Sequence, residues 1–136
     1  MKKTTIKYMT FCDHAFLSQN NKLNIIGIFD QVNVAQFPGG LPRAFVVAIL
    51  NTEPNKNRRF SIKGKLGDKT VFPAINMEGA VGESGVHNII VDLAGIGFPQ
   101  QGDYEFVLSE DDEEVGSMKL KVSLVQQYEK HNKLPN

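Results

Sequence analysis

The sequence predicts an all-β protein built as a two-sheet antiparallel sandwich of about eight or nine strands. Short segments alternate apolar and polar residues with the period of two that half-buried strands require. Clusters of Gly, Pro, Asn and Asp separate these segments and predict turns. We find no amphipathic pattern that would support a helix of about ten residues. A β-rich sandwich satisfies all three observations, whereas a barrel is a less favoured alternative.

The clearest element is a β-hairpin over residues 102–122. Both arms alternate, and an acidic turn over residues 110–114 joins them. The residues predicted to face inward are Tyr104, Phe106, Leu108, Met118, Leu120 and Val122. This hairpin is the closing strand pair of the predicted fold.

The first half of the chain predicts three strands before a clear break. Residues 4–12 form a strand that is apolar on both faces, and the Asn-Asn pair of the turn 18–22 tolerates positive φ. The next strand covers residues 23–29, with a bulge expected at Gly27. Residues 30–37 continue as a strand, and FPGGLPR at 37–43 is a loop because its prolines and glycines disfavour a ladder.

The second half begins with residues 44–50, which are apolar throughout and are predicted to lie deepest in the fold. A polar loop leads to an alternating strand that ends at Leu66, and the Gly67-Asp68 turn returns the chain. Pro73 predicts that residues 69–77 form an edge strand or contain a bulge. A Gly-rich loop, a strand over residues 86–94 and the loop 95–101 complete the pattern, and we expect the last ten or so residues to be loosely held.

Composition narrows the class of protein. A chain of 136 residues forms one domain by default, and its net charge of zero gives no electrostatic reason for a nucleic-acid or membrane partner. Cys12 is the only cysteine and there is no tryptophan, so any immunoglobulin-like architecture lacks the usual disulfide and its packing partner. The N-terminus lacks a signal-peptide pattern, and no apolar run approaches the roughly 18 residues of a membrane span. We expect a cytoplasmic protein.

Two stretches carry a family resemblance: CDHAFLSQNNKLNIIGIFDQV at 12–32 and VDLAGIGFPQQGDYEFVLSEDDEEVGSMKLKV at 91–122. Together they resemble a family of small, uncharacterised bacterial and phage-related proteins, a domain of unknown function. The chain departs from the family pattern at the hairpin turn, where Asp111, Asp112 and Glu113 replace an Asp-Gly pair and suggest a longer loop. The resemblance implies a β-sandwich and a bacterial or phage origin, and it implies no catalytic residues.

Catalytic and metal sites have weak support in the sequence. Cys12, Asp13 and His14 are adjacent, but neighbours on a strand point to opposite faces, and Cys12 fits the pattern of a core residue. A ligand, metal or enzyme site around His14 and His87 is chemically admissible, although no spacing brings the two together. The acidic turn 110–114 lacks the spacing of a calcium loop and is predicted to be solvated. We therefore expect no metal, no cofactor and no enzymatic activity.

The basic residues Arg59, Lys63 and Lys65 fall on one face of a predicted strand. Such a stripe can contact phosphates, but no aromatic residue is interleaved to stack a base. Lysines on a solvated strand also protect an edge from aggregation. We do not expect nucleic acid as a partner.

The leading hypothesis is a non-enzymatic binding or assembly module that presents loops or sheet edges to a protein partner. Its candidate contact residues in the Pro-Gly loops are Phe37, Leu41, Arg43 and Phe98. A homo-oligomer that uses an edge strand is the simplest version, and we expect no membrane association. Two alternatives stay open: a small-ligand or metal-binding protein or enzyme around His14 and His87, and a phage or mobile-element accessory protein that blocks a host factor.

Overall fold

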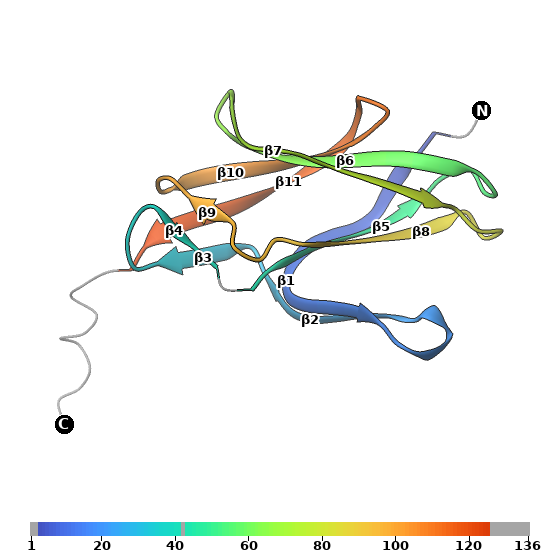
Figure 1. Ribbon diagram of the computed structural model, residues 1–136, viewed down its shortest axis with the longest axis horizontal. Helices are drawn as coiled ribbons and strands as arrows, with labels where there is room; N and C mark the ends of the chain where they lie inside the picture. The colour runs from blue at the N-terminus through green and yellow to red at the C-terminus, as the bar shows by residue number, and fades with distance from the viewer. Residues whose placement is uncertain (1–2, 42, 126–136) are drawn as a thin grey trace.

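The structure, a computed structural model, describes residues 3–41 and 43–125. This part of the chain is all-β, with eleven strands, no α-helix and one short 3₁₀ turn at Gln19–Asn21 (Figure 1). The strands are β1 (Thr5–Leu17), β2 (Leu23–Phe29), β3 (Gln31–Val34), β4 (Gly39–Gly40), β5 (Phe45–Asn51), β6 (Asn57–Leu66), β7 (Lys69–Ala80), β8 (Val86–Asp92), β9 (Gly97–Phe98), β10 (Gly102–Glu110) and β11 (Glu113–Leu124). The last ten or so residues, which we expect to be loosely held, lie outside the described residues.

Two larger sheets face each other across one core. The four-stranded sheet has the order β2-β1-β5-β8, and the five-stranded sheet has the order β3-β11-β10-β6-β7. In Figure 1 strands β6, β7, β10 and β11 of the five-stranded sheet lie above β2, β5 and β8 of the four-stranded sheet. The largest buried cluster draws on both sheets, with Phe11 and Val46 from one and Phe60, Phe106 and Leu120 from the other.

Strand β5 is the central strand that the sequence predicts. It pairs with β1 on one side and β8 on the other. Val46, Val47, Ala48 and Leu50 have no exposed surface. Both faces of β5 are covered, which explains why its sequence is apolar without interruption.

The predicted hairpin is confirmed, but its loop is short. Tyr104 lies opposite Leu120 and Phe106 lies opposite Met118. Only Asp111 and Asp112 separate the two strands, and both have positive φ, at 49° and 68°. The expectation of a longer loop is wrong because the short polar side chain of aspartate tolerates the left-handed conformation that a two-residue turn requires.

The expectation of eight or nine strands is too low because β4 and β9 lie inside segments predicted as loops. Gly39 pairs with Phe98 and Gly40 pairs with Gly97. A Cβ on Gly40 would lie 2.3 Å from the carbonyl oxygen of Ile96, so glycine permits this close approach of the two backbones. The glycines of residues 37–43 disfavour a long strand, but here they permit the short pairing of β4 with β9.

The sheets are also not purely antiparallel. Strand β3 runs parallel to β11, with Val32 opposite Val122. Strands that a hairpin joins must pair antiparallel, but no hairpin joins β3 to β11. β3 follows β2 of the other sheet through Asp30, so it can run parallel to β11. Val32 and Val34 still alternate with exposed neighbours, as the sequence predicts.

The bulge expected at Gly27 is absent. Cys12 pairs with Ile28 and His14 with Ile26, so the register is the same on both sides of Gly27. Gly27 has φ +72°, and a Cβ there would lie 2.3 Å from Asp13 Oδ2. Glycine is required by its backbone conformation and by the adjacent carboxylate, without an inserted residue. By contrast, the irregular β6–β7 register next to Pro73, in the edge strand β7, is as predicted.

Candidate functional site

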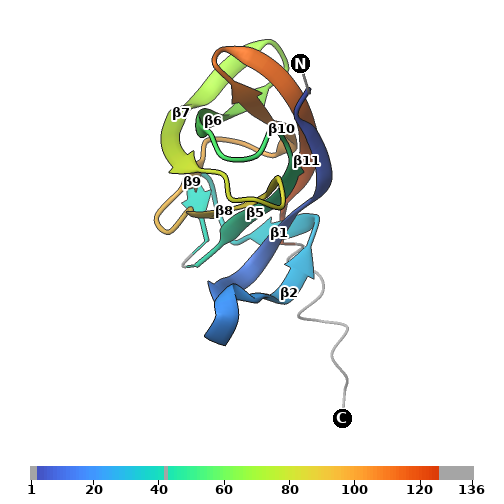
Figure 2. The ribbon, with the colours of Figure 1, turned by 90° about the vertical axis from the view of Figure 1, so that its right-hand side faces the viewer.

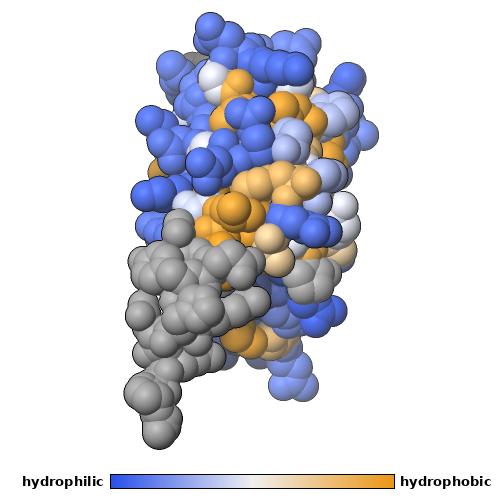
Figure 3. Space-filling view, turned by 90° about the vertical axis from the view of Figure 1, so that its left-hand side faces the viewer, coloured by the Kyte–Doolittle hydropathy of each residue, from blue (hydrophilic) through white to orange (hydrophobic). Residues whose placement is uncertain are grey.

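The loop residues proposed from the sequence have very different exposure. Phe98 is only 1% exposed and packs edge-on against Tyr104, with ring centroids 5.0 Å apart. Phe37 and Leu41 are partly buried against the main core, whereas Arg43 is exposed. The end of the molecule that carries β4 and β9 shows patches of apolar surface between hydrophilic ones (Figure 3). Phe98 therefore has almost no surface to offer a partner, and Arg43 has the most accessible side chain of the four.

The basic stripe on β6 is interleaved with carboxylates. Arg59 Nε lies 3.9 Å from Glu78 Oε2, and Lys65 Nζ lies 4.0 Å from Glu105 Oε1. Lys63 lies opposite Val107 of β10. Because the neighbouring strands supply negative charges, this face does not form a continuous positive surface.

The two histidines lie on opposite faces of the four-stranded sheet. The His14 ring is 5.2 Å from that of Phe45, and His87 pairs with Leu50 and stacks on Phe60 at 5.6 Å. Phe45 and Leu50 are five positions apart on β5, which corresponds to about 16 Å along a strand. The structure does not bring His14 and His87 together.

Cys12 is a core residue, as predicted. Its side chain has no exposed surface and packs with Ala15, Phe45 and Val47. Burial raises the pKa of the Cys12 thiol, which disfavours the thiolate that nucleophilic chemistry needs. Within residues 3–41 and 43–125, no group of three or more His, Cys, Asp or Glu residues is placed to hold a metal ion.

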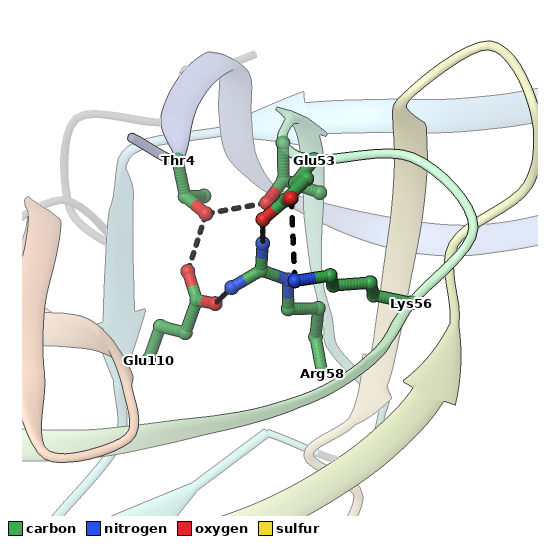
Figure 4. A network of polar contacts seen from close by, with 6 residues as sticks. Thr4, Glu53, Lys56, Arg58 and Glu110 are labelled. Atoms are coloured by element: carbon green, nitrogen blue, oxygen red, sulfur yellow. Dashed lines mark hydrogen bonds and ion pairs between the residues drawn. The ribbon is translucent and has the colours of Figure 1, made fainter. Parts of the chain in front are cut away.

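A partly buried polar network lies where the hairpin tip meets the start of β1 (Figure 4). Arg58 donates through Nη1 to Glu110 Oε2 at 2.5 Å and through Nη2 to Glu53 Oε1 at 2.8 Å. Thr4 donates to the other oxygen of Glu110 and lies 2.6 Å from the Thr52 hydroxyl. Lys56 hydrogen-bonds the Glu53 carboxylate and lowers its pKa. The network joins three segments that are distant in sequence, at Thr4, at residues 52–58 and at Glu110.

This network corrects the expectation that the acidic turn is merely solvated. The Glu110 side chain is 11% exposed and the Arg58 side chain 17%, whereas Asp111, Asp112, Glu113 and Glu114 are exposed. The sequence contains the signal, because Arg58 is in phase with Phe60 and Ile62, and Glu110 is in phase with Phe106 and Leu108. A hollow of about 450 Å³ lies beside the pair. Arg58 is paired with both Glu110 and Glu53, and of its nitrogen atoms Nε has no partner among the described residues. The arrangement is that of a structural ion pair.

The two most exposed large apolar residues among those described lie on the outer face of the four-stranded sheet. Ile26 is 53% exposed and Ile28 is 58% exposed, both on β2. Phe16 and Tyr8 of β1 are 39% and 43% exposed. The register places Ile26 opposite His14 and Ile28 opposite Cys12, so these side chains share one face. We call Tyr8, Phe16, Ile26 and Ile28 the outer apolar surface.

Strand β2 is also a sheet edge without the usual protection. It is terminal in its sheet and, in the described part of the chain, pairs only with β1. Figure 2 shows the β1–β2 hairpin at the lower margin of the molecule. The segment LNIIGIF contains no charged residue and no proline, whereas natural edge strands commonly carry lysine, proline or a bulge to prevent pairing. Strand β2 is therefore competent to pair with another strand.

The match to a known family covers most of the chain. Residues 7–123 match DUF6941, a family of unknown function. The chain belongs to the DUF6941 family. The predicted membership of a domain family of unknown function is thus confirmed, and the matched region contains both β2 and the β10–β11 hairpin. No curated protein matches the chain significantly. Among the described residues, no helix is long and apolar enough to span a membrane.

Proposed function

We propose that this DUF6941 protein is a non-enzymatic assembly module that forms a homodimer through β2. The observation that carries the proposal is the coincidence of a bare, uncharged strand edge with Ile26 and Ile28, both more than half exposed. Main-chain hydrogen bonds between two β2 strands supply the pairing, and the isoleucines supply apolar burial. The two features lie on the same seven residues, Leu23–Phe29.

A second copy of the chain is the occupant that fits this edge. In an antiparallel pair with the two-fold axis at Ile26, Ile26 lies opposite its own copy, and Ile28 lies opposite Asn24 of the second copy. No charges meet across this pairing, and the chain as a whole has a net charge of zero. Burying a complete isoleucine contributes about 1.5–3 kcal/mol, and each half-exposed one contributes part of that amount.

The finer description of the fold belongs to the same proposal. We regard the two facing sheets as a sandwich of immunoglobulin-like architecture, supported by the core that both sheets share. A cytoplasmic location is supported by the unpaired, buried thiol of Cys12. A bacterial or phage origin is supported by the sequence resemblance alone.

Sedimentation velocity or light scattering tests the dimer. We expect monomer at about 1 µM chain and dimer at about 100 µM, which corresponds to micromolar affinity. Ile26→Lys places two like charges opposite each other across the axis, so this variant should remain monomeric at about 100 µM.

The matched control is Ile75→Lys. Ile75 is 42% exposed and lies on β7, the edge of the other sheet. This variant should dimerise as the wild type does. A wild-type chain that stays monomeric at about 1 mM, or an Ile26→Lys variant that dimerises normally, would contradict the proposal.

A further inference from the structure

The edge strand β2 carries a carboxylate that belongs to its neighbour β1. The base pairs of strand register on either side of Asp13 place it opposite Gly27 of β2. Its carboxylate occupies the space that a Cβ on Gly27 would need, with Asp13 Cγ only 2.8 Å from that position. The carboxylate therefore lies over the backbone of Gly27, on the outermost strand of the four-stranded sheet.

Asp13 offers this charge without a cation beside it. Its side chain is exposed, and none of the residues that the structure describes forms an ion pair with it. Alternation along β2 puts the Gly27 position on the face opposite to Ile26 and Ile28. The β2 edge thus presents isoleucines on one face and a negative charge on the other.

A second copy of β2 does not supply the missing cation. In the pair proposed above, with the axis at Ile26, Ile25 of the second copy lies opposite Gly27. The other β2 residues on the Gly27 face are Leu23 and Phe29. Directly opposite residues of an antiparallel pair point to the same face, so shifting the register still brings no basic residue opposite Gly27. The homodimer leaves both carboxylates without a cation.

We propose that the β2 edge binds an extended strand of a partner protein that places lysine or arginine opposite Gly27 and apolar residues opposite Ile26 and Ile28. The main chain of this strand continues the sheet, and its apolar face covers the isoleucines. Directly opposite Cβ atoms are about 4.5–5.5 Å apart, so the cation of a long side chain reaches the Asp13 carboxylate. This inference rests on the pairing of β2 in the proposed function, and the partner strand displaces the second copy.

Two designed peptides test the preference for a cation. The probe is Thr-Val-Lys-Val-Thr-Val-Thr with both ends capped, and its counterpart has glutamate in place of lysine. In an antiparallel pair that begins opposite Phe29, the lysine lies opposite Gly27 and valines lie opposite Ile26 and Ile28. Titration of the lysine peptide into the ¹⁵N-labelled chain should shift the amides of residues 23–29, with a dissociation constant below about 1 mM. The glutamate peptide should bind at least about threefold more weakly, because it places like charges together.

Asp13→Asn tests the residue that sets this preference. The variant should bind the lysine and glutamate peptides with equal affinity, because the charge opposite the peptide side chain is gone. The matched control is Asp68→Asn, which removes the same charge from the turn between β6 and β7 of the other sheet and should keep the preference. In the wild-type chain the preference should decrease when salt is raised from about 20 mM to about 500 mM.

The outcomes separate this inference from the homodimer. A wild-type chain that stays monomeric but prefers the lysine peptide would remove the homodimer and support the partner strand. Absence of peptide binding at about 1 mM, equal binding of the two peptides to the wild-type chain, or a preference that survives Asp13→Asn would overturn the inference, even if the chain dimerises. The wild-type comparison and its salt dependence decide the question if Asp13→Asn is poorly folded.

Discussion

His87 is a residue whose environment sets a dependence of stability on pH. Its ring stacks on Phe60, and burial lowers its pKa below the usual 6.5. The unfolded chain therefore binds a proton at His87 at a higher pH than the folded chain does. The stabilisation is complete above pH 6.5 and is lost as the pH falls towards the folded pKa. We expect the free energy of unfolding, from urea titrations, to decrease between about pH 7 and pH 5.

The control for this prediction is His87→Gln, which removes the titrating group. The variant should show a smaller decrease in the free energy of unfolding over the same pH interval, because the proton uptake of His87 on unfolding is gone. An identical pH dependence in the two proteins would show that His87 does not contribute.

The two-residue turn between β10 and β11 gives a prediction about an element. Asp111 and Asp112 adopt φ of 49° and 68°, which aspartate tolerates and glycine prefers. Asp112→Gly should raise the free energy of unfolding by about 0.5–1 kcal/mol, because it relieves this conformational cost and removes one charge from an acidic tip. Thermal or urea unfolding measures the change.

The matched control for the turn is Asp68→Gly in the β6–β7 turn. Asp68 does not have positive φ, and Gly67 beside it already provides the left-handed conformation at φ +64°. Added glycine there should be neutral or slightly destabilising, because it increases the freedom of the unfolded chain. Stabilisation by Asp68→Gly equal to that by Asp112→Gly would refute the conformational explanation.

Most elements of this fold follow from local patterns in the sequence. Alternation in the 102–122 hairpin places Glu110 in phase with Phe106 and Leu108. In the strand that ends at Leu66, alternation places Arg58 in phase with Phe60 and Ile62. Strands β4 and β9 could not be predicted, because their pairing depends on two loops that only tertiary packing brings together. The exposure of Ile26 and Ile28 could not be predicted either, since strand order decides which apolar strand lies at an edge.

At the scale of the whole molecule, the chain crosses between the two sheets on both sides of the core. Asp30 carries it from β2 to β3, and residues 81–85 carry it from β7 to β8. The Arg58 network links the sheets at the hairpin tip, because Thr4 precedes β1 and Thr52 follows β5, whereas Arg58 and Glu110 belong to β6 and β10. The chain also crosses between the sheets at this end, through residues 52–56 between β5 and β6, so the side-chain contacts reinforce a backbone connection.

The network should therefore contribute to global stability. Arg58→Met keeps an apolar stem but leaves the Glu110 carboxylate, which is 11% exposed, without its cation. Removal of one partner of a buried ion pair typically costs about 3–5 kcal/mol, so we expect a loss of about 3 kcal/mol in urea unfolding. The double variant Arg58→Met with Glu110→Leu should recover much of that loss, because no buried charge is left unpaired. A loss below about 1 kcal/mol for Arg58→Met would instead indicate that Arg58 and Glu110 form a solvent-screened surface pair.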